Sequence, residues 1–198
     1  MYRFLETIRI EDGQICNADL HQERMDRSRY ELLGISDPLP LEKEITSEVE
    51  QLRGIWKCRL VYSCTTLEMS LTPYVPRRIN SLRLITDNQI EYTYKWEDRS
   101  KLMQCFSLRG ACDEIILVKN GFITDTSYSN LAFFDGKDWV TPANPLLNGV
   151  RRQALIRQRK IKTADIAPAE LSKYKKLSLI NAMLDLGEVE VPCTSVYT

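Results

Sequence analysis

The stretch EIILVKNGFITDTSYSNLAFFDG, residues 114–136, decides the fold of this 198-residue chain. Its first five residues are almost all apolar, a pattern typical of a short strand that is covered on both faces. Asn120-Gly121 and Asp135-Gly136 are strong hairpin signals, because both pairs tolerate the positive φ angles of tight two-residue turns. Between them, a strand delivers Asp125 into a run of small polar residues that ends at Asn130. We therefore expect a β-rich region built around this turn.

The chain on either side of this region mixes helices and strands. Upstream we expect a hairpin over residues 3–16 that turns at Asp12-Gly13. A helix should follow, capped by Asn17 or Asp19 and ending near Leu33 before Gly34. After it we expect a polar helix over 41–53, β-strands over 55–63 and 66–72, and a linker over 74–78. Downstream we expect a strand over 81–86, a helix over 98–109 and a basic helix over 149–159, followed by alternating strand-like and helix-like pieces. The fold class is therefore α/β (α+β), with a small lobe over residues 1–78 and a larger β-rich lobe over residues 79–198.

The composition excludes several classes of function. Lysine plus arginine and aspartate plus glutamate each number 27, so the formal net charge is zero and no global field attracts nucleic acid or an anionic membrane. One histidine, and six cysteines without a Cys-x-x-Cys pair, argue against a metal site and a Ser-His-Asp hydrolase. We interpret the cysteines as mostly buried thiols in a reducing cytoplasm. The start is soon charged, so no signal peptide is expected, and no apolar run reaches the length of a membrane span. The glycines form neither a Gly-x-Gly-x-x-Gly nor a Walker loop, so a phosphate would need a helix start and fixed basic side chains.

Two of the four candidate functional segments are centred on a basic side chain, Arg24 in the first and Lys95 in the second. His21 and Arg24 are three residues apart and so share one helix face, where Arg24 can reach a phosphate or a carboxylate. A solvated face with a capping histidine is the simpler interpretation. Lys95 lies between Tyr94 and Trp96, and partial burial there would lower its pKa toward that of a nucleophile or general base. A surface lysine that keeps its amine in water is the alternative.

The other two segments contain a carboxylate and a helix start. A buried Asp125 can hold a protonated ring nitrogen, although the same residues also suit an ordinary polar turn between two strands. A turn ending at Gly149 begins the basic helix, whose first N–H groups lack intrahelical partners and can bind an anion. A plain helix start with a solvated basic turn fits equally well. The basic residues that follow, Arg151 and Arg152 among them, also permit a nucleic-acid-binding hypothesis.

Taken in order, these segments resemble those of the class IV aminotransferases, the fold-type IV enzymes that use pyridoxal 5′-phosphate (PLP). The resemblance runs from Phe4-Leu5-Glu6-Thr7-Ile8-Arg9 to the last strand, and it implies the two-lobed architecture of D-amino-acid aminotransferase-like proteins. His21-x-x-Arg24 matches the family's His-x-x-Arg, so Arg24 is expected to bind the PLP phosphate. Lys95-x-x-Asp98-Arg99 is similar to Lys-x-x-Asn-Arg, so Lys95 is expected to carry the Schiff base.

The resemblance assigns the rest of the site to later segments. Asp125-x-x-x-x-Asn130-Leu131 stands where the family has Glu-x-x-x-x-Asn, and Thr141-Pro142 and Leu147-x-Gly149-Val150-x-Arg152 match Thr-Pro and Leu-x-Gly-Ile-x-Arg. Leu179-Ile180-Asn181-Ala182-Met183 is similar to a late strand whose turn adds a phosphate contact. The expected catalytic residue is Lys95, and the expected cofactor contacts are Arg24, Asp125, Asn130, Gly149, Val150, Arg151, Asn181 and Ala182, with no metal.

Three departures from the family pattern bear on these assignments. The chain is shorter than the usual member, so loops over the substrate are expected to be missing. Asp125 is one methylene shorter than the usual Glu, about 1.5 Å less reach, so either the ring lies closer to its strand or the ring contact is weaker. Asn148 and Arg151 replace a common Pro and a common Thr. A backbone phosphate contact survives the second change, a hydroxyl contact is lost, and a new cation can compensate.

The resemblance implies an enzyme in which the freed Lys95 amine acts as general base while the cofactor ring stores electrons. The Asn181-Ala182 form favours a 4-amino-4-deoxychorismate lyase-like enzyme, which releases pyruvate. The alternatives are a class IV aminotransferase for branched-chain or D-amino acids, or a catalytically silent PLP-fold binding protein. Arg9, Arg59 and Arg109 are candidates for binding a substrate carboxylate. A homodimer is implied, and neither nucleic acid nor membrane is an expected partner.

Overall fold

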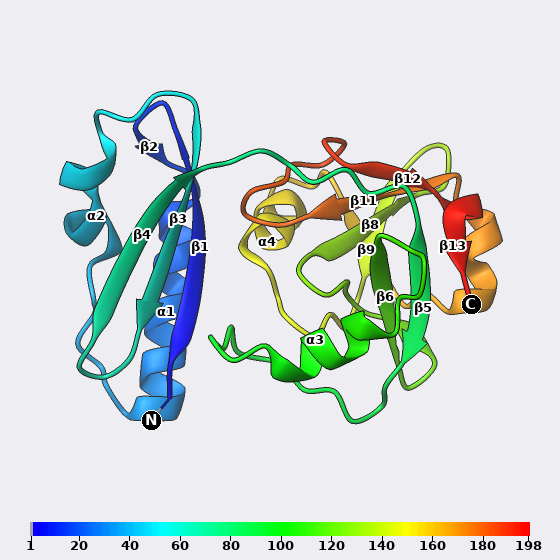
Figure 1. Ribbon diagram of the computed structural model, residues 1–198, viewed down its shortest axis with the longest axis horizontal. Coiled ribbons are helices and arrows are strands. Elements are labelled where there is room, and N and C mark those ends of the chain that lie inside the picture. Colours follow the sequence, from blue (N-terminus) through cyan, green and yellow to red (C-terminus); the bar gives the residue numbers. More distant parts are fainter. Residues whose placement is uncertain (1) are drawn as a thin grey trace. The chain divides into compact units, whose positions relative to one another are not determined.

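The computed structural model describes residues 2–198, which separate into two units (Figure 1). The first unit holds the chain up to Pro76 together with Tyr94–Asp98, and the second holds Arg77–Thr93 and Arg99–Thr198. Lys95 is therefore folded with the N-terminal residues, although it follows the predicted linker in sequence.

The first unit is an antiparallel sheet with two helices packed on one face. In the sheet order β2-β1-β3-β4 its strands are β1 (Phe4–Glu11), β2 (Gln14–Ile15), β3 (Ile55–Tyr62) and β4 (Leu67–Pro73), and its helices are α1 (Ala18–Leu33) and α2 (Leu41–Val49). Ile8 and Ile10 of β1 are fully buried against Met25 of α1 and Ile45 of α2. Since side chains alternate along a strand, the even-numbered residues of β1 face the helices.

Most of the predicted elements of this unit are confirmed, with shifted ends. The hairpin turns at Asp12 and Gly13, whose φ angles are 49° and 84°. Helix α1 ends at Gly34, which takes a φ of 67°. Asn17, the N-cap residue of α1, also has a positive φ, and its side chain forms no capping hydrogen bond. Helix α2 stops at Val49, short of the predicted residue 53.

The second unit contains two sheets. The five-stranded sheet has the order β10-β9-β8-β11-β12, from β8 (Asn130–Phe134), β9 (Trp139–Pro142), β10 (Lys162–Ala164), β11 (Lys176–Ile180) and β12 (Glu190–Pro192). The four-stranded sheet has the order β13-β5-β6-β7, from β5 (Leu82–Thr86), β6 (Glu114–Lys119), β7 (Phe122–Ile123) and β13 (Val196–Tyr197). The helices are α3 (Ser100–Ser107), α4 (Val150–Arg157) and the 3-10 helices η1 (Pro168–Lys173) and η2 (Cys193–Ser195).

The region around residues 114–136 folds as its sequence predicts. Strand β6 is buried over Glu114–Val118, and β5 runs parallel to it while β7 returns antiparallel through the Asn120-Gly121 turn. The Asp135-Gly136 turn joins β8 to β9. Leu155 of α4 packs on the five-stranded sheet with Ala132 of β8 and Ile180 of β11. The mixed α and β fold is confirmed, and it places the Asp125 turn between β7 and β8.

Half of the cysteines are buried, fewer than the sequence predicts. All six cysteines are free thiols, and Cys58, Cys105 and Cys193 are buried whereas Cys64 is exposed. Among the described residues, none of the helices combines the length and the apolar character needed to traverse a bilayer.

Candidate functional site

A buried charge cluster in the first unit surrounds Glu6. Glu6 shares the inward face of β1 with Ile8, so its carboxylate points into the layer between the sheet and α1. Arg24 Nε donates to Glu6 Oε1 at 2.8 Å and Arg24 Nη2 donates to Oε2, while His21 Nδ1 lies 2.6 Å from Oε2. All three side chains are buried, which excludes the solvated helix face as an interpretation of His21 and Arg24.

The ionisation of this cluster follows from its contacts. Burial alone raises the pKa of Glu6, but the charge of Arg24 and the hydrogen bonds from His21 and Arg24 outweigh it and lower the pKa to about 2. Burial lowers the pKa of His21, so its ring is neutral and Nδ1 donates to Glu6. Within residues 2–198, His21 Nε2 is buried without a hydrogen-bond partner. Because Glu6 is ionised and accepts hydrogen bonds from Arg24 at both carboxylate oxygens, it holds the guanidinium in one fixed position.

The Lys95 segment is attached to the edge of β1. Leu5 N donates to the carbonyl oxygen of Lys95 at 2.8 Å, Phe4 and Trp96 form a β-bridge, and their rings stack with centroids 4.9 Å apart. Glu97 accepts hydrogen bonds from Arg3 at 2.5 Å and from Arg59 at 2.8 Å. Lys95 is partly buried, as its aromatic neighbours predict, and its backbone lies beside the strand that carries Glu6.

Asp125 in the second unit is buried and hydrogen-bonded at both carboxylate oxygens. Asn130 Nδ2 donates to Oδ1 at 2.7 Å, and the backbone N–H of Leu147 donates to Oδ2 at 2.9 Å. Asn130 Nδ2 also donates to the carbonyl of Leu147 at 2.8 Å. Burial raises the pKa of Asp125 to about 6, even though these donors favour its charged form. Both N–H bonds of the Asn130 amide are thus used within the protein.

Gly149 connects this carboxylate to the start of α4. Its φ of −66° and ψ of 146° suit any residue, so conformation does not require glycine. A Cβ added at this position, however, would overlap Asn130 Oδ1. Val150 and Arg151 follow at once and provide the first N–H groups of the helix, as predicted from the sequence.

The two arginines of α4 have different surroundings. The Arg151 guanidinium pairs with Asp185, with Nε 2.9 Å from Oδ1. The side chain that we expected to compensate near a phosphate is thus paired with a carboxylate of this chain. Arg152 is buried, and burial lowers its pKa. It donates to Asn148 Oδ1 at 2.8 Å and to the carbonyl of Pro142 at 2.7 Å, which fixes the turn before the helix.

Asn181 and Ala182 form a tight turn directly after β11. Asn181 Oδ1 accepts the backbone N–H groups of Met183 at 2.8 Å and Leu184 at 3.0 Å. Asn181 Nδ2 donates to the carbonyl of Tyr128 at 3.5 Å, which links this turn to the one that carries Asp125.

The predicted site residues are divided between the units. Arg24 and Lys95 belong to the first unit, and the second contains Asp125, Asn130, Gly149, Val150, Arg151, Asn181 and Ala182. The structure joins the Asp125, Asn130 and Gly149 positions by direct contacts. Sequence reasoning missed Glu6 as the partner of Arg24, although a carboxylate in the apolar register of a strand is a signal of a buried ion pair.

The arginines proposed from sequence for a substrate carboxylate contact neighbouring groups. Arg9 Nε pairs with Glu11 at 3.1 Å and Arg59 with Glu97 at 2.8 Å. Arg109 donates to the carbonyl of Phe106 at 3.3 Å and lies over its ring. These contacts do not distinguish any of the three arginines as the one that binds a substrate carboxylate.

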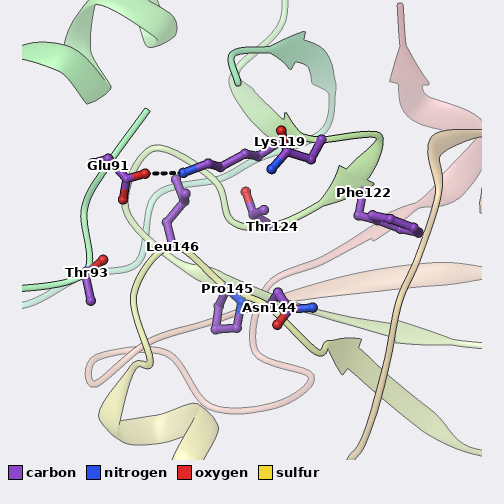
Figure 2. Close-up of a pocket in the computed structure, with 9 residues that line it drawn as sticks. Glu91, Thr93, Lys119, Phe122, Thr124, Asn144, Pro145 and Leu146 are labelled. Carbon is purple, nitrogen blue, oxygen red and sulfur yellow. Dashed lines mark hydrogen bonds and ion pairs between the residues drawn. The ribbon is translucent and has the colours of Figure 1, made fainter. Parts of the chain in front are cut away.

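A surface pocket of about 310 Å³ lies elsewhere in the second unit (Figure 2). Lys119 on its wall pairs with Glu91 at 2.5 Å, and Phe122, Thr124 and Leu146 complete much of the lining. It contains none of the predicted site residues, although Thr124 directly precedes Asp125.

The chain is similar to known proteins over nearly its whole length. The amino-transferase class IV family matches residues 3–191. An uncharacterized protein of Haemophilus influenzae is 35% identical over 195 residues, which cover 92% of this chain and 98% of that protein. A crystal structure from Haemophilus somnus 129PT, provisionally named a 4-amino-4-deoxychorismate lyase, is 31% identical with a TM-score of 0.89, and the match covers 94% of this chain and 98% of that one.

More distant structures share the fold. A hypothetical aminotransferase from Mycobacterium tuberculosis in its PLP-bound form is 17% identical with a TM-score of 0.80, covering 98% of this chain and 81% of that one. The family match spans nearly the whole chain, and the relatives above 30% identity cover almost all of it. This chain belongs to the class IV amino-transferase family: it has the fold-type IV architecture and is an enzyme.

Proposed function

We propose that this enzyme uses PLP and releases pyruvate from an amino-acid-like substrate, as a 4-amino-4-deoxychorismate lyase-like enzyme does. The observation that carries the cofactor proposal is the buried Asp125 carboxylate, tied through Asn130 and Leu147 to the residues that begin α4. Support for the lyase type comes from the provisional name of the relative at 31% identity and from the Asn181-Ala182 turn.

The residues present fit PLP chemically. A buried carboxylate suits a protonated ring nitrogen, and the N–H groups of a helix start suit a phosphate. When bound, PLP supplies an electron sink that stabilises negative charge on the substrate α-carbon. The PLP-bound relative from Mycobacterium tuberculosis has the same fold, which supports the cofactor proposal.

Each residue has a defined task in this proposal. Lys95 would hold the cofactor through its ε-amine and would move the substrate α-proton. Asp125 is ionised above about pH 6 and would accept a hydrogen bond from a ring N–H. By the family resemblance, Arg24 and the N–H groups of Val150 and Arg151 would bind the phosphate, and Glu6 holds the Arg24 guanidinium in place.

The cofactor proposal is tested by absorbance and by covalent trapping. Purified protein with added PLP is expected to absorb in the visible range, and borohydride is expected to fix the cofactor on Lys95. Lys95→Ala should lose this attachment, whereas Lys101→Ala, on the exposed surface of α3, should retain it. A protein that takes up no PLP, or a Lys95→Ala variant with unchanged turnover, contradicts the proposal.

The reaction type is tested by product analysis. Pyruvate formed from 4-amino-4-deoxychorismate without an amino acceptor supports the lyase. Keto acid formed from an amino acid only when an acceptor is present supports the second candidate, a class IV transaminase of branched-chain or D-amino acids. PLP uptake without α-proton exchange on any amino acid would instead favour the silent binding protein.

We also propose a homodimer, from the family resemblance, and a cytoplasmic location, from the six cysteines without a Cys-x-x-Cys pair. Sedimentation equilibrium tests the first, and fractionation of cells tests the second.

A further inference from the structure

Arg77 is a cation fixed beside the Asp125 turn, and none of the sequence motifs includes it. The residue that fixes it is Glu114, the first residue of β6, whose side chain is completely buried. Glu114 Oε1 accepts the backbone N–H groups of Ile115 at 2.9 Å and Ser127 at 3.2 Å. Glu114 Oε2 lies 3.4 Å from Arg77 Nη2. One buried carboxylate therefore anchors both the turn and the arginine.

Tyr128 supplies a platform for the same guanidinium. The central carbon of the Arg77 guanidinium lies 4.8 Å from the centroid of the Tyr128 ring, a distance at which a cation is attracted to an aromatic face. Tyr128 lies between Asp125 and Asn130 in sequence, and its carbonyl accepts the Asn181 amide. Arg77 thus rests on the residue that links two turns assigned to the cofactor.

The guanidinium has donors available for a ligand. The Arg77 side chain is 59% exposed, and within residues 2–198 its one hydrogen bond uses Nη2 at a long distance. The contact with the Tyr128 ring restrains the guanidinium, and its other N–H bonds can meet a carboxylate in the paired geometry that arginine favours. Arg99 differs, because its Nη2 is bound to the carbonyl of Ser127 at 2.6 Å and so serves the turn itself.

We propose that Arg77 binds a carboxylate of the amino-acid-like substrate. This assignment rests on the proposed function, because that function supplies a substrate with a carboxylate. We prefer Arg77 to Arg9, Arg59 and Arg109, because its guanidinium lies against the Tyr128 ring, between Asp125 and Asn130 in sequence.

The test compares Arg77→Gln with Arg78→Gln in the PLP-loaded enzyme. Both positions are exposed and adjacent, and both variants lose one positive charge. We expect Arg77→Gln to raise KM for the carboxylate substrate about 10- to 100-fold, the loss typical of a charge-assisted hydrogen-bond pair, with a smaller change in kcat. Arg78→Gln should leave both constants unchanged, and the affinity for PLP should be the same in all three proteins.

A second measurement does not depend on turnover. Propionate, a carboxylate without an amine, is titrated into each protein while the Arg77 side-chain N–H resonance is followed by NMR; propylamine serves as the control probe. Propionate should shift the resonance in the wild type and in Arg78→Gln, and propylamine should not. Arg77→Lys keeps a charge opposite Glu114, so it should fold, bind PLP normally and show a KM between those of the wild type and Arg77→Gln.

The outcomes separate this inference from the proposed function. A wild-type protein that binds no PLP refutes the proposed function before any variant is made. Normal PLP binding with no propionate shift at Arg77, or with an Arg77→Gln KM equal to that of Arg78→Gln, refutes the inference alone. Weaker PLP binding by Arg77→Gln with an unchanged KM also refutes it, because Arg77 would then serve the phosphate.

Discussion

Gly149→Ala tests the packing of the turn before α4. Alanine adopts the φ of −66° and ψ of 146° at this position without strain, so any loss of stability must come from the added methyl group. That methyl would overlap Asn130 Oδ1, and the Asn130 amide must therefore move. Its movement breaks the hydrogen bonds from Nδ2 to Asp125 at 2.7 Å and to the Leu147 carbonyl at 2.8 Å.

The expected loss follows from these two bonds. A hydrogen bond to a charged group contributes about 1.5–3 kcal/mol to the free energy of unfolding, and a neutral one about 1 kcal/mol. Alanine in place of glycine recovers about 0.4–1 kcal/mol by restricting the unfolded chain. Gly149→Ala should therefore lower the free energy of unfolding by about 2–3 kcal/mol at pH 8, where Asp125 is ionised.

A double-mutant cycle in urea identifies the cause. Asn130→Ala removes the obstructing amide, so Gly149→Ala made in that background should be neutral or slightly stabilising. The same loss of about 2–3 kcal/mol in both backgrounds would refute the reasoning, because the methyl group would then be colliding with something other than Asn130.

Three further predictions concern buried polar groups, each checked by urea unfolding. Glu6→Gln leaves Arg24 buried without its carboxylate and should lower the free energy of unfolding by about 3–5 kcal/mol, whereas Glu11→Gln, at an exposed pair, should lower it by less than about 1 kcal/mol. The stability that Glu6 contributes is present above its ordinary pKa of 4.5 and is lost as the pH falls toward about 2, so Glu6→Gln should flatten the acid limb of the stability curve. Asp125 acts in the opposite sense: its pKa is raised from 3.8 to about 6, so the folded protein gains up to about 3 kcal/mol as the pH falls between these values, and Asp125→Asn should abolish that gain.

The turns of this fold could be predicted because their signals are local. Asp12-Gly13 and Asn120-Gly121 both adopt positive φ angles, which few other residue pairs tolerate, and each joins adjacent antiparallel strands. Gly34 ends α1 for the same reason. The resemblance to the class IV aminotransferases placed Asp125, Asn130 and Gly149 in one site, and in the structure the Asn130 side chain lies against the other two positions.

The partners of buried charges could not be predicted, because they depend on long-range packing. Glu6 and Glu114 both interrupt apolar patterns, so burial of a carboxylate was detectable in the sequence. The donors that neutralise these two carboxylates could not be identified from the sequence. The donors of Glu114 include Ser127 and Arg77, which are 13 and 37 residues away in sequence, and these are brought to it by the pairing of β5 with β6 and by the turn after β7. The same limit hid the attachment of the Lys95 segment to β1.

The aspartate at position 125 has a structural explanation that the motif alone does not supply. Its oxygens accept N–H groups from Asn130 and Leu147 at 2.7 and 2.9 Å, so the carboxylate belongs to the same hydrogen-bonded unit as the residues before α4. A glutamate would carry the oxygens about 1.5 Å further and would displace at least one donor. The shorter side chain therefore ties the proposed partner of the ring nitrogen to the proposed phosphate turn. Because one fold supports both lyases and transaminases, the choice between these reactions must depend on groups that contact the substrate. Arg77, which lies against Tyr128 of this turn and pairs with Glu114, is the side chain that we propose contacts the substrate carboxylate.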